Sequence, residues 1–166
     1  MQISMELLTL GLAVSTSALS AAYYMDYKGR NKDQLVQGVV AVFGGLIAFM
    51  SLFFSWVNVE GFEVSGFDLG IVFVYLTNNQ LVRALTFFLI FFALMIILGG
   101  FLQIIGYGLA KEIIRTSSIL NIFLTVIIVL WLSFIPVPAL SLILEITPWI
   151  CLSGATIGWI STKLYR

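Results

Sequence analysis

Glu145 is the ionisable side chain in this sequence that is the strongest candidate for a proton or cation site. It lies in the stretch "PVPALSLILEITPW", residues 136–149. If this stretch enters a membrane near Ala139, the carboxylate lies about 9 Å below the outer boundary, at about 1.5 Å per residue, where a proton or cation site is the default hypothesis. If it enters near Pro148, Glu145 is an ordinary surface carboxylate. The three prolines of the stretch favour the surface interpretation.

The other residue types that commonly carry catalysis or bind metals are scarce. Histidine is absent and Cys151 is the single cysteine, which excludes Ser-His and Cys-His pairs and removes the usual ligands of haem, zinc and iron–sulfur centres. The segment "GYGLAK", residues 106–111, has two glycines but lacks the third of a dinucleotide fingerprint. We therefore predict that the protein is not an enzyme and has no cofactor or metal ion.

Two amide side chains interrupt otherwise apolar runs. Gln103 lies about two turns from the end of one run, and Asn121 lies about one turn into the next. Their similar depth predicts a mutual hydrogen bond, and such pairs inside membranes contribute about 0.6 kcal/mol on average. We interpret both residues as structural.

The composition indicates which secondary-structure elements carry these side chains. Only 10% of the 166 residues are charged and 61% are hydrophobic, whereas about a quarter of the residues in soluble domains are charged. Apolar runs of about 20 residues are long enough to cross a bilayer as helices. The sequence predicts one all-α integral membrane domain, residues 1–166, with five transmembrane helices, or four if the first run lies on the membrane. The predicted spans are about 4–25, 36–57, 84–110, 117–135 and 139–162.

Basic residues predict the orientation of these spans, because Lys and Arg are retained on the cytoplasmic side. Seven of the eight basic residues lie in three segments, and only Arg83 falls elsewhere. We predict an outside N-terminus and a cytoplasmic C-terminus in the cell membrane, with an envelope or organelle membrane as open alternatives. Because the net charge is zero, we expect no nucleic acid partner. The seven residues are Lys28, Arg30, Lys32, Lys111, Arg115, Lys163 and Arg166.

The segment "SWVNVEGFEVSG", residues 55–66, alternates apolar and polar residues with a period of two, which is typical of strands. A turn at Glu60-Gly61 places Val59 opposite Phe62 and Val57 opposite Val64. These four apolar side chains then share one face that needs a cover. We predict that the face, anchored at the membrane boundary by Trp56, forms a partner-facing cap. Its cover is the protein's own helices, the membrane interface or a neighbouring subunit.

The rest of the outer cap, residues 58–83, contains a second short element. Asp68 is a suitable N-cap for the apolar run "LGIVFVYLT", residues 69–77. Nine residues are too few to cross a bilayer. We therefore predict a short interfacial helix between the second and third spans.

Small residues recur on the predicted spans, where they allow close helix contact in the absence of a hydrophobic driving force. Their spacing does not distinguish packing within the chain from packing against partners. The candidate packing residues are Gly11, Ser15, Ala18 and Ala22 in the first run, Gly44 and Gly45 in the second, Gly99 and Gly100 in the third, and Gly154 and Gly158 in the last.

These features favour a structural or accessory subunit of a larger membrane assembly over an enzyme. We expect other integral membrane subunits and membrane lipid as partners, and a homo-oligomer is also compatible with the sequence. The alternative is a small oligomeric channel or transporter that uses Glu145 as its proton or cation site.

A structured outer loop after Trp56, followed by three further spans, resembles the topology of claudin-like tetraspan proteins. The loop lacks the cysteine pair of that family. The N-terminal run, about residues 4–25, has no counterpart there. The resemblance therefore implies a topology and no function.

Overall fold

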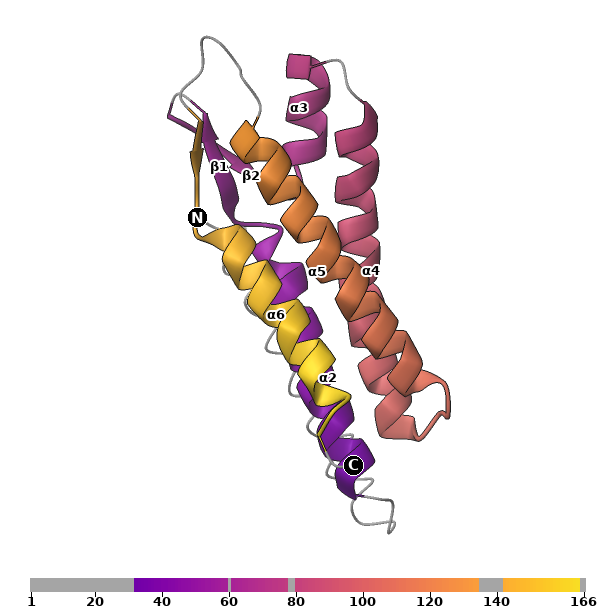
Figure 1. Ribbon diagram of the computed structural model, residues 1–166. Helices are drawn as coiled ribbons and strands as arrows, with labels where there is room; N and C mark the ends of the chain where they lie inside the picture. The colour runs from indigo at the N-terminus through magenta and orange to yellow at the C-terminus, as the bar shows by residue number, and fades with distance from the viewer. Residues whose placement is uncertain (1–31, 60, 78–79, 135–141, 165–166) are drawn as a thin grey trace.

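The computed structural model describes residues 32–59, 61–77, 80–134 and 142–164 (Figure 1). These residues are mostly helical. The first predicted span, about 4–25, lies outside the described residues, as do its small residues Gly11, Ser15, Ala18 and Ala22. The helices are α2 (Lys32–Ser51), α3 (Leu69–Thr77), α4 (Gln80–Ile105), α5 (Ala110–Phe134) and α6 (Thr147–Ser161), and the strands are β1 (Ser55–Val59), β2 (Phe62–Ser65) and β3 (Leu142–Leu144).

Three of the described helices are long and apolar enough to cross a membrane: α2, α5 and the part of α4 from Arg83 to Ile105. In the bundle, α2 packs against α4 and α6, and α5 packs against the same two helices. The strands and α3 lie at one end of the bundle, hereafter the sheet end (Figure 1). The α4–α5 connection and the end of α6 lie at the opposite end, hereafter the basic end.

The second predicted span, 36–57, extends too far, because α2 ends at Ser51. The next three residues form tight turns, with the amide of Leu52 donating to Phe49 and that of Phe54 donating to Ser51. The Ser51 carbonyl also accepts a hydrogen bond from the Trp56 indole at 2.9 Å. These bonds satisfy carbonyls that a helix terminus leaves open, and the chain then continues as strand β1.

The third predicted span, 84–110, is also too long at its end. The amide of Tyr107 donates to the Leu102 carbonyl at 2.9 Å, and that of Gly106 donates to Gln103 at 3.0 Å. Gly106 has a positive φ of 85°. This is the hydrogen-bond pattern of a Schellman cap, so α4 stops at Ile105 and α5 begins seven residues before the predicted start at 117.

The helix predicted to start near Ala139 does not form, because residues 142–144 are strand β3; α6 begins at Thr147, next to the alternative start near Pro148. Helix α6 begins at Thr147 with Pro148 in its first turn, where the fixed φ of proline suits a helix and its missing N–H costs nothing. Its 15 residues extend about 22 Å, less than a full bilayer core of about 30 Å.

The sheet has the order β2-β1-β3 and both pairs are antiparallel. The predicted hairpin register is confirmed, with Val57 opposite Val64 and Val59 opposite Phe62. Gly61 has a φ of 89°, and its amide donates to the Asn58 side chain at 2.8 Å. Strand β3, which was not predicted, adds to the other side of β1 and leads directly toward α6.

Candidate functional site

Trp56 forms the base of the cap and is not an interfacial anchor, contrary to the prediction. Its side chain is only 1% exposed. The register shifts between Ser55 and Val57, and a bulge of this kind changes the direction of a side chain. Gly66 lies directly on the indole, since a Cβ there would be 2.6 Å from Nε1. The tryptophan therefore connects the end of α2 to the hairpin.

The apolar face of the hairpin is covered mainly by the protein itself. Val57, Val59 and Val64 are buried in the main core cluster, together with Leu132 of α5. Phe62 is the exception, with 77% of its side chain exposed. The prediction of a partner-facing cap is therefore wrong for the three valines, because side chains of the protein's own helices, such as Leu52 and Leu132, pack with them. Only the phenylalanine at the hairpin tip remains open.

A short polar turn leads from the hairpin into α3. The Ser65 hydroxyl donates to the Asp68 carboxylate at 2.7 Å, and the Asp68 amide donates to that hydroxyl at 3.1 Å. The Asp68 carbonyl accepts from the amides of Ile71 and Val72, so the helix begins where the sequence predicted. After this turn, α3 packs against α4.

The glycines of α2 and α6 bring these helices into backbone contact. A Cβ at Gly44 would lie 2.6 Å from the Gly154 carbonyl oxygen and 2.6 Å from the Gly158 nitrogen. A Cβ at Gly154 would lie 2.5 Å from the Ala48 nitrogen. Only glycine permits an approach this close.

Glycines also lie at the contacts of α4 with α2 and α5. A Cβ at Gly100 would lie 2.8 Å from the Gly38 carbonyl oxygen on α2. A Cβ at Gly45 would lie less than 3.0 Å from Ile97, and a Cβ at Gly99 would lie less than 3.0 Å from Ile114 on α5. The described candidate packing glycines thus make their close contacts within this chain.

The predicted hydrogen bond between Gln103 and Asn121 is wrong, because the two side chains face different neighbours. The Gln103 amide donates to the Gln37 side chain on α2 at 3.0 Å, and Gln37 donates to the Leu164 carbonyl beyond α6. Asn121 instead donates to the Leu89 carbonyl at 3.1 Å. Equal depth does not determine which way each side chain points around its helix.

Asn121 belongs to a buried polar cluster that the sequence reasoning missed. Its Oδ1 lies 3.7 Å from the Cys151 thiol, and the Thr125 hydroxyl lies 3.7 Å from the same sulfur. All three side chains are fully buried. The four-residue spacing of Asn121 and Thr125 on one helix face was the available signal. The cluster joins α4, α5 and α6 by hydrogen bonds.

Glu145 lies in the connection between β3 and α6, ahead of the first residue of that helix. Its amide donates to the Trp56 carbonyl at 2.9 Å, and its side chain is half-buried. The depth of 9 Å expected for a helix starting near Ala139 therefore does not apply. Across the described ranges, no group of three His, Cys, Asp or Glu side chains is placed to hold a metal ion.

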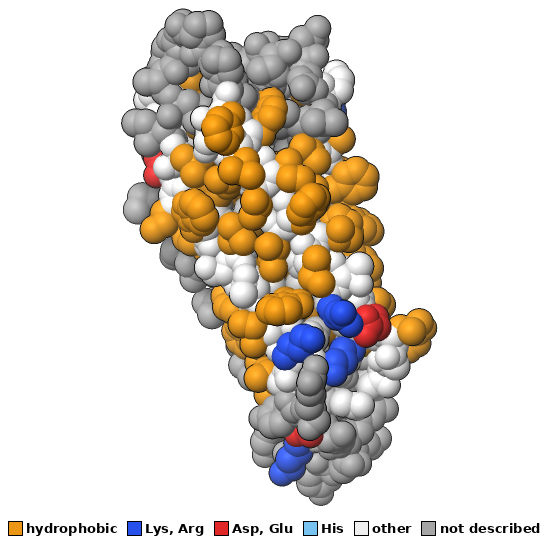
Figure 2. All heavy atoms as spheres, in the orientation of Figure 1, with side chains coloured by type: hydrophobic (Ala, Val, Ile, Leu, Met, Phe, Trp, Pro, Cys, Tyr) orange, Lys and Arg blue, Asp and Glu red, His pale blue; other side chains and the backbone are white. Residues whose placement is uncertain are grey.

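Charges are distributed unequally between the two ends. Figure 2 shows Lys and Arg side chains gathered at the basic end, below a wide apolar belt. The basic residues of this end are Lys32, where α2 begins, Lys111 and Arg115, where α5 begins, and Lys163, which follows α6. Among the described residues, the one ion pair joins Arg115 to Glu112 at 3.7 Å. Glu63, Asp68 and Glu145 lie at or next to the sheet end.

Comparison with known proteins adds no functional assignment. No protein-family model, curated protein or solved structure matches this chain.

Proposed function

We propose that the protein is a multi-pass membrane protein that acts as a non-catalytic accessory subunit of a larger membrane assembly. In this proposal, the apolar belt lies in lipid, the basic end faces the cytoplasm and the sheet end faces outward. Docking to other integral membrane subunits occurs through the hairpin tip at Phe62.

The outward faces of the long helices support the membrane placement. Exposed large apolar residues recur with spacings of four, three and four, which places them on one side of each helix. Contiguous apolar surface of this extent is rare on soluble monomers. The stripes are Phe87, Phe91, Leu94 and Leu98 on α4, and Ile119, Phe123, Val126 and Leu130 on α5.

The basic end supports the orientation. Lys32, Lys111, Arg115 and Lys163 come from three separate segments that converge there, as retention of basic residues in the cytoplasm requires. The described acidic residues outside this end, Glu63, Asp68 and Glu145, gather near the sheet.

Phe62 is the observation that carries the docking proposal. Its neighbours on the apolar face of the hairpin are buried, yet its own ring is 77% exposed at the tip of an edge strand. Fully burying an aromatic side chain contributes about 1.5–3 kcal/mol, and aromatic residues, phenylalanine among them, are enriched at the cores of protein interfaces. A partner pocket that accepts the ring would gain that free energy.

The tight interior favours a structural role over transport. Backbone contact at Gly44 and Gly154 leaves no room for a pore between α2 and α6 at these residues. Glu145, the residue on which the channel alternative depends, precedes α6 and is not part of a described helix. Within the described part of the chain, we therefore favour the accessory role.

Gentle solubilisation of the tagged protein from its native membrane tests this proposal. We expect stoichiometric recovery of one or more other membrane proteins, and we expect Phe62→Ser to reduce that recovery severalfold. Leu109→Ser is the matched control, because Leu109 is 61% exposed but lies in the α4–α5 connection at the opposite end. Recovery of a homogeneous oligomer of this chain alone, or equal recovery with Phe62→Ser, would contradict the proposal.

A further inference from the structure

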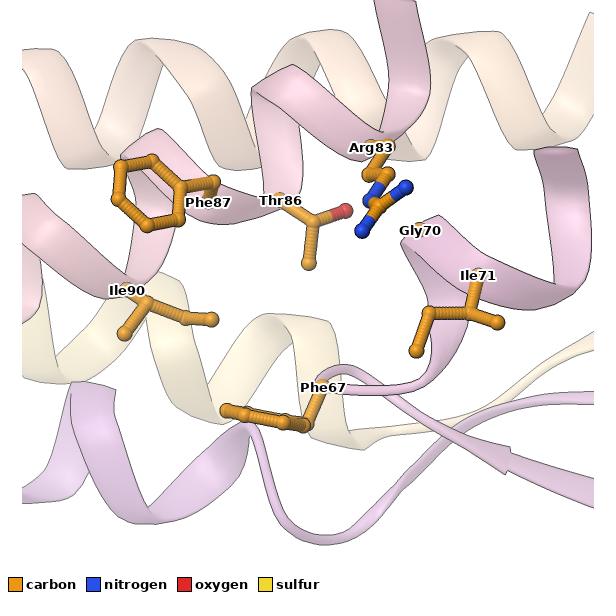
Figure 3. A pocket seen from close by; sticks show the side chains of 7 residues that line it. All are labelled: Phe67, Gly70, Ile71, Arg83, Thr86, Phe87 and Ile90. Atoms are coloured by element: carbon orange, nitrogen blue, oxygen red, sulfur yellow. The ribbon is translucent and has the colours of Figure 1, made fainter. Parts of the chain in front are cut away.

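An open apolar cleft lies between α3 and the first turns of α4. It encloses about 170 Å³, and Phe67, Ile71, Phe87 and Ile90 supply most of its wall. Figure 3 shows Ile71 and Ile90 reaching in from opposite sides and the guanidinium of Arg83 pointing into the same space. The cleft therefore combines an apolar wall with one fixed positive charge.

The hollow continues along α4. A second space of about 450 Å³ is lined by Gln80, Ala84 and Phe88 and shares Arg83 and Phe87 with the first. The ring of Phe87 is 66% exposed and separates the two spaces. Arg83 therefore lines both spaces.

Arg83 differs in its electrostatic setting from the other described basic residues. They belong to the basic end, whereas Arg83 lies at the sheet end with Glu63, Asp68 and Glu145. Among the described residues, Arg83 takes part in no ion pair, and its side chain is exposed. An anionic group could thus reach the guanidinium from outside the protein.

The depth of Arg83 indicates which anion this is. Arg83 lies one turn into α4, and no charged residue follows it in that helix. In the membrane placement proposed above, this residue lies at the boundary between hydrocarbon and headgroups, the depth of phospholipid phosphates. The apolar walls at Phe87 and Ile90 continue from there toward the hydrocarbon core.

We propose that this cleft is a binding site for an anionic membrane phospholipid. The guanidinium of Arg83 donates paired hydrogen bonds to the phosphate, a geometry that arginine fits better than lysine. The upper part of one acyl chain lies against Ile71, Phe87 and Ile90. This inference rests on the proposed membrane placement but not on docking through Phe62.

Photoactivatable lipids test the site directly. The purified protein is reconstituted into phosphatidylcholine vesicles that contain a small fraction of phosphatidylglycerol or phosphatidylcholine with a diazirine on the acyl chain. Peptide mass spectrometry then locates the adducts. We expect adducts in 67–90 from phosphatidylglycerol to exceed those from phosphatidylcholine, and Arg83→Gln to lower them about tenfold, the ratio that corresponds to roughly 1.4 kcal/mol.

Two further variants serve as controls. Arg115→Gln removes a positive charge at the basic end and should leave the adducts in 67–90 unchanged. Ile71→Trp fills the cleft and should lower the adducts of both lipids there. Size-exclusion elution and the melting temperature verify that each variant is folded.

Equal labelling of 67–90 by the two lipids, or labelling that Arg83→Gln does not change, would overturn the proposal. A protein segment that occupies the cleft in native membranes, and so excludes lipid adducts there, would also overturn it. Partner recovery with Phe62→Ser is measured separately, so failure of the lipid site and failure of the docking proposal are distinguishable.

Discussion

Single side chains terminate helices and connect elements in this protein. The Trp56 indole satisfies the Ser51 carbonyl at the end of α2, and its ring lies under Gly66. A tryptophan near a predicted span end is usually assigned to the membrane interface. Its burial here follows from the turn that reverses the chain after α2, which hydropathy does not reveal.

Trp56→Phe should lower the free energy of unfolding by about 1–3 kcal/mol, because it leaves the buried Ser51 carbonyl without this donor and opens a small space. Denaturant titration in detergent, followed by circular dichroism, measures the change. Trp149→Phe is the control, since Trp149 is 52% exposed, and it should change the free energy by less than about 0.5 kcal/mol. Equal effects of the two variants would contradict the assigned role of Trp56.

Ser118 is a buried residue whose replacement should not lower the free energy of unfolding. Its hydroxyl is buried and has no hydrogen-bond partner in the described structure. Ser118→Ala removes a hydroxyl whose loss of water on burial is not offset by a hydrogen bond. The free energy of unfolding should therefore stay unchanged or increase by about 1 kcal/mol. Ser161→Ala should lower stability by about 1 kcal/mol, because that hydroxyl donates to the Gly158 carbonyl at 2.6 Å. A large loss of stability with Ser118→Ala would indicate a partner that the described residues do not include.

At the scale of elements, the sequence was sufficient where the determinants are local. A period of two and a glycine turn predicted the pairing of Val57 with Val64, and Asp68 predicted the start of α3. The helix ends at Ser51 and Ile105 were missed, because they depend on the Trp56 contact and on the Gly106 cap. Strand β3 was missed because its pairing with β1 joins residues far apart in the sequence.

The candidate site was predicted less well for the same reason. Alternation identified an apolar hairpin face, but burial of Val57 and Val64 by distant helix ends is a tertiary outcome. Likewise, equal depth suggested a bond between Gln103 and Asn121, whereas helix rotation directs them to Gln37 and Leu89.

The contact between α2 and α6 depends on glycine. Gly154→Ala should destabilise the protein by about 1–3 kcal/mol, because the new methyl group would lie 2.5 Å from the Ala48 nitrogen. Gly108→Ala is the matched control, since a Cβ there meets no atom within 4 Å. Thermal melting in detergent compares the two variants. Similar melting temperatures would show that α2 and α6 are not in backbone contact.

At the scale of the whole molecule, charge and apolar surface vary along one axis, from the basic end through the apolar belt to the sheet end (Figure 2). This arrangement is the basis for the proposed orientation. The single cysteine, Cys151, is fully buried and so gives a low background for thiol labelling.

In intact cells, a membrane-impermeant maleimide should label Glu63→Cys, because this residue of the hairpin is exposed and lies at the proposed outer end. Lys111→Cys, at the basic end, should be labelled only after permeabilisation. The unsubstituted protein should remain unlabelled in both conditions. The reverse pattern would invert the proposed orientation, and labelling of both variants in intact cells would contradict a membrane-crossing arrangement.

Site-specific photocrosslinking in the native membrane detects docking through the hairpin tip at the residue itself. A benzophenone amino acid replaces Phe62 in one variant and Leu109 in a second. We expect a discrete adduct with another integral membrane protein from position 62 and none from position 109. An absence of adducts at position 62, or adducts only with further copies of this chain, would contradict this docking.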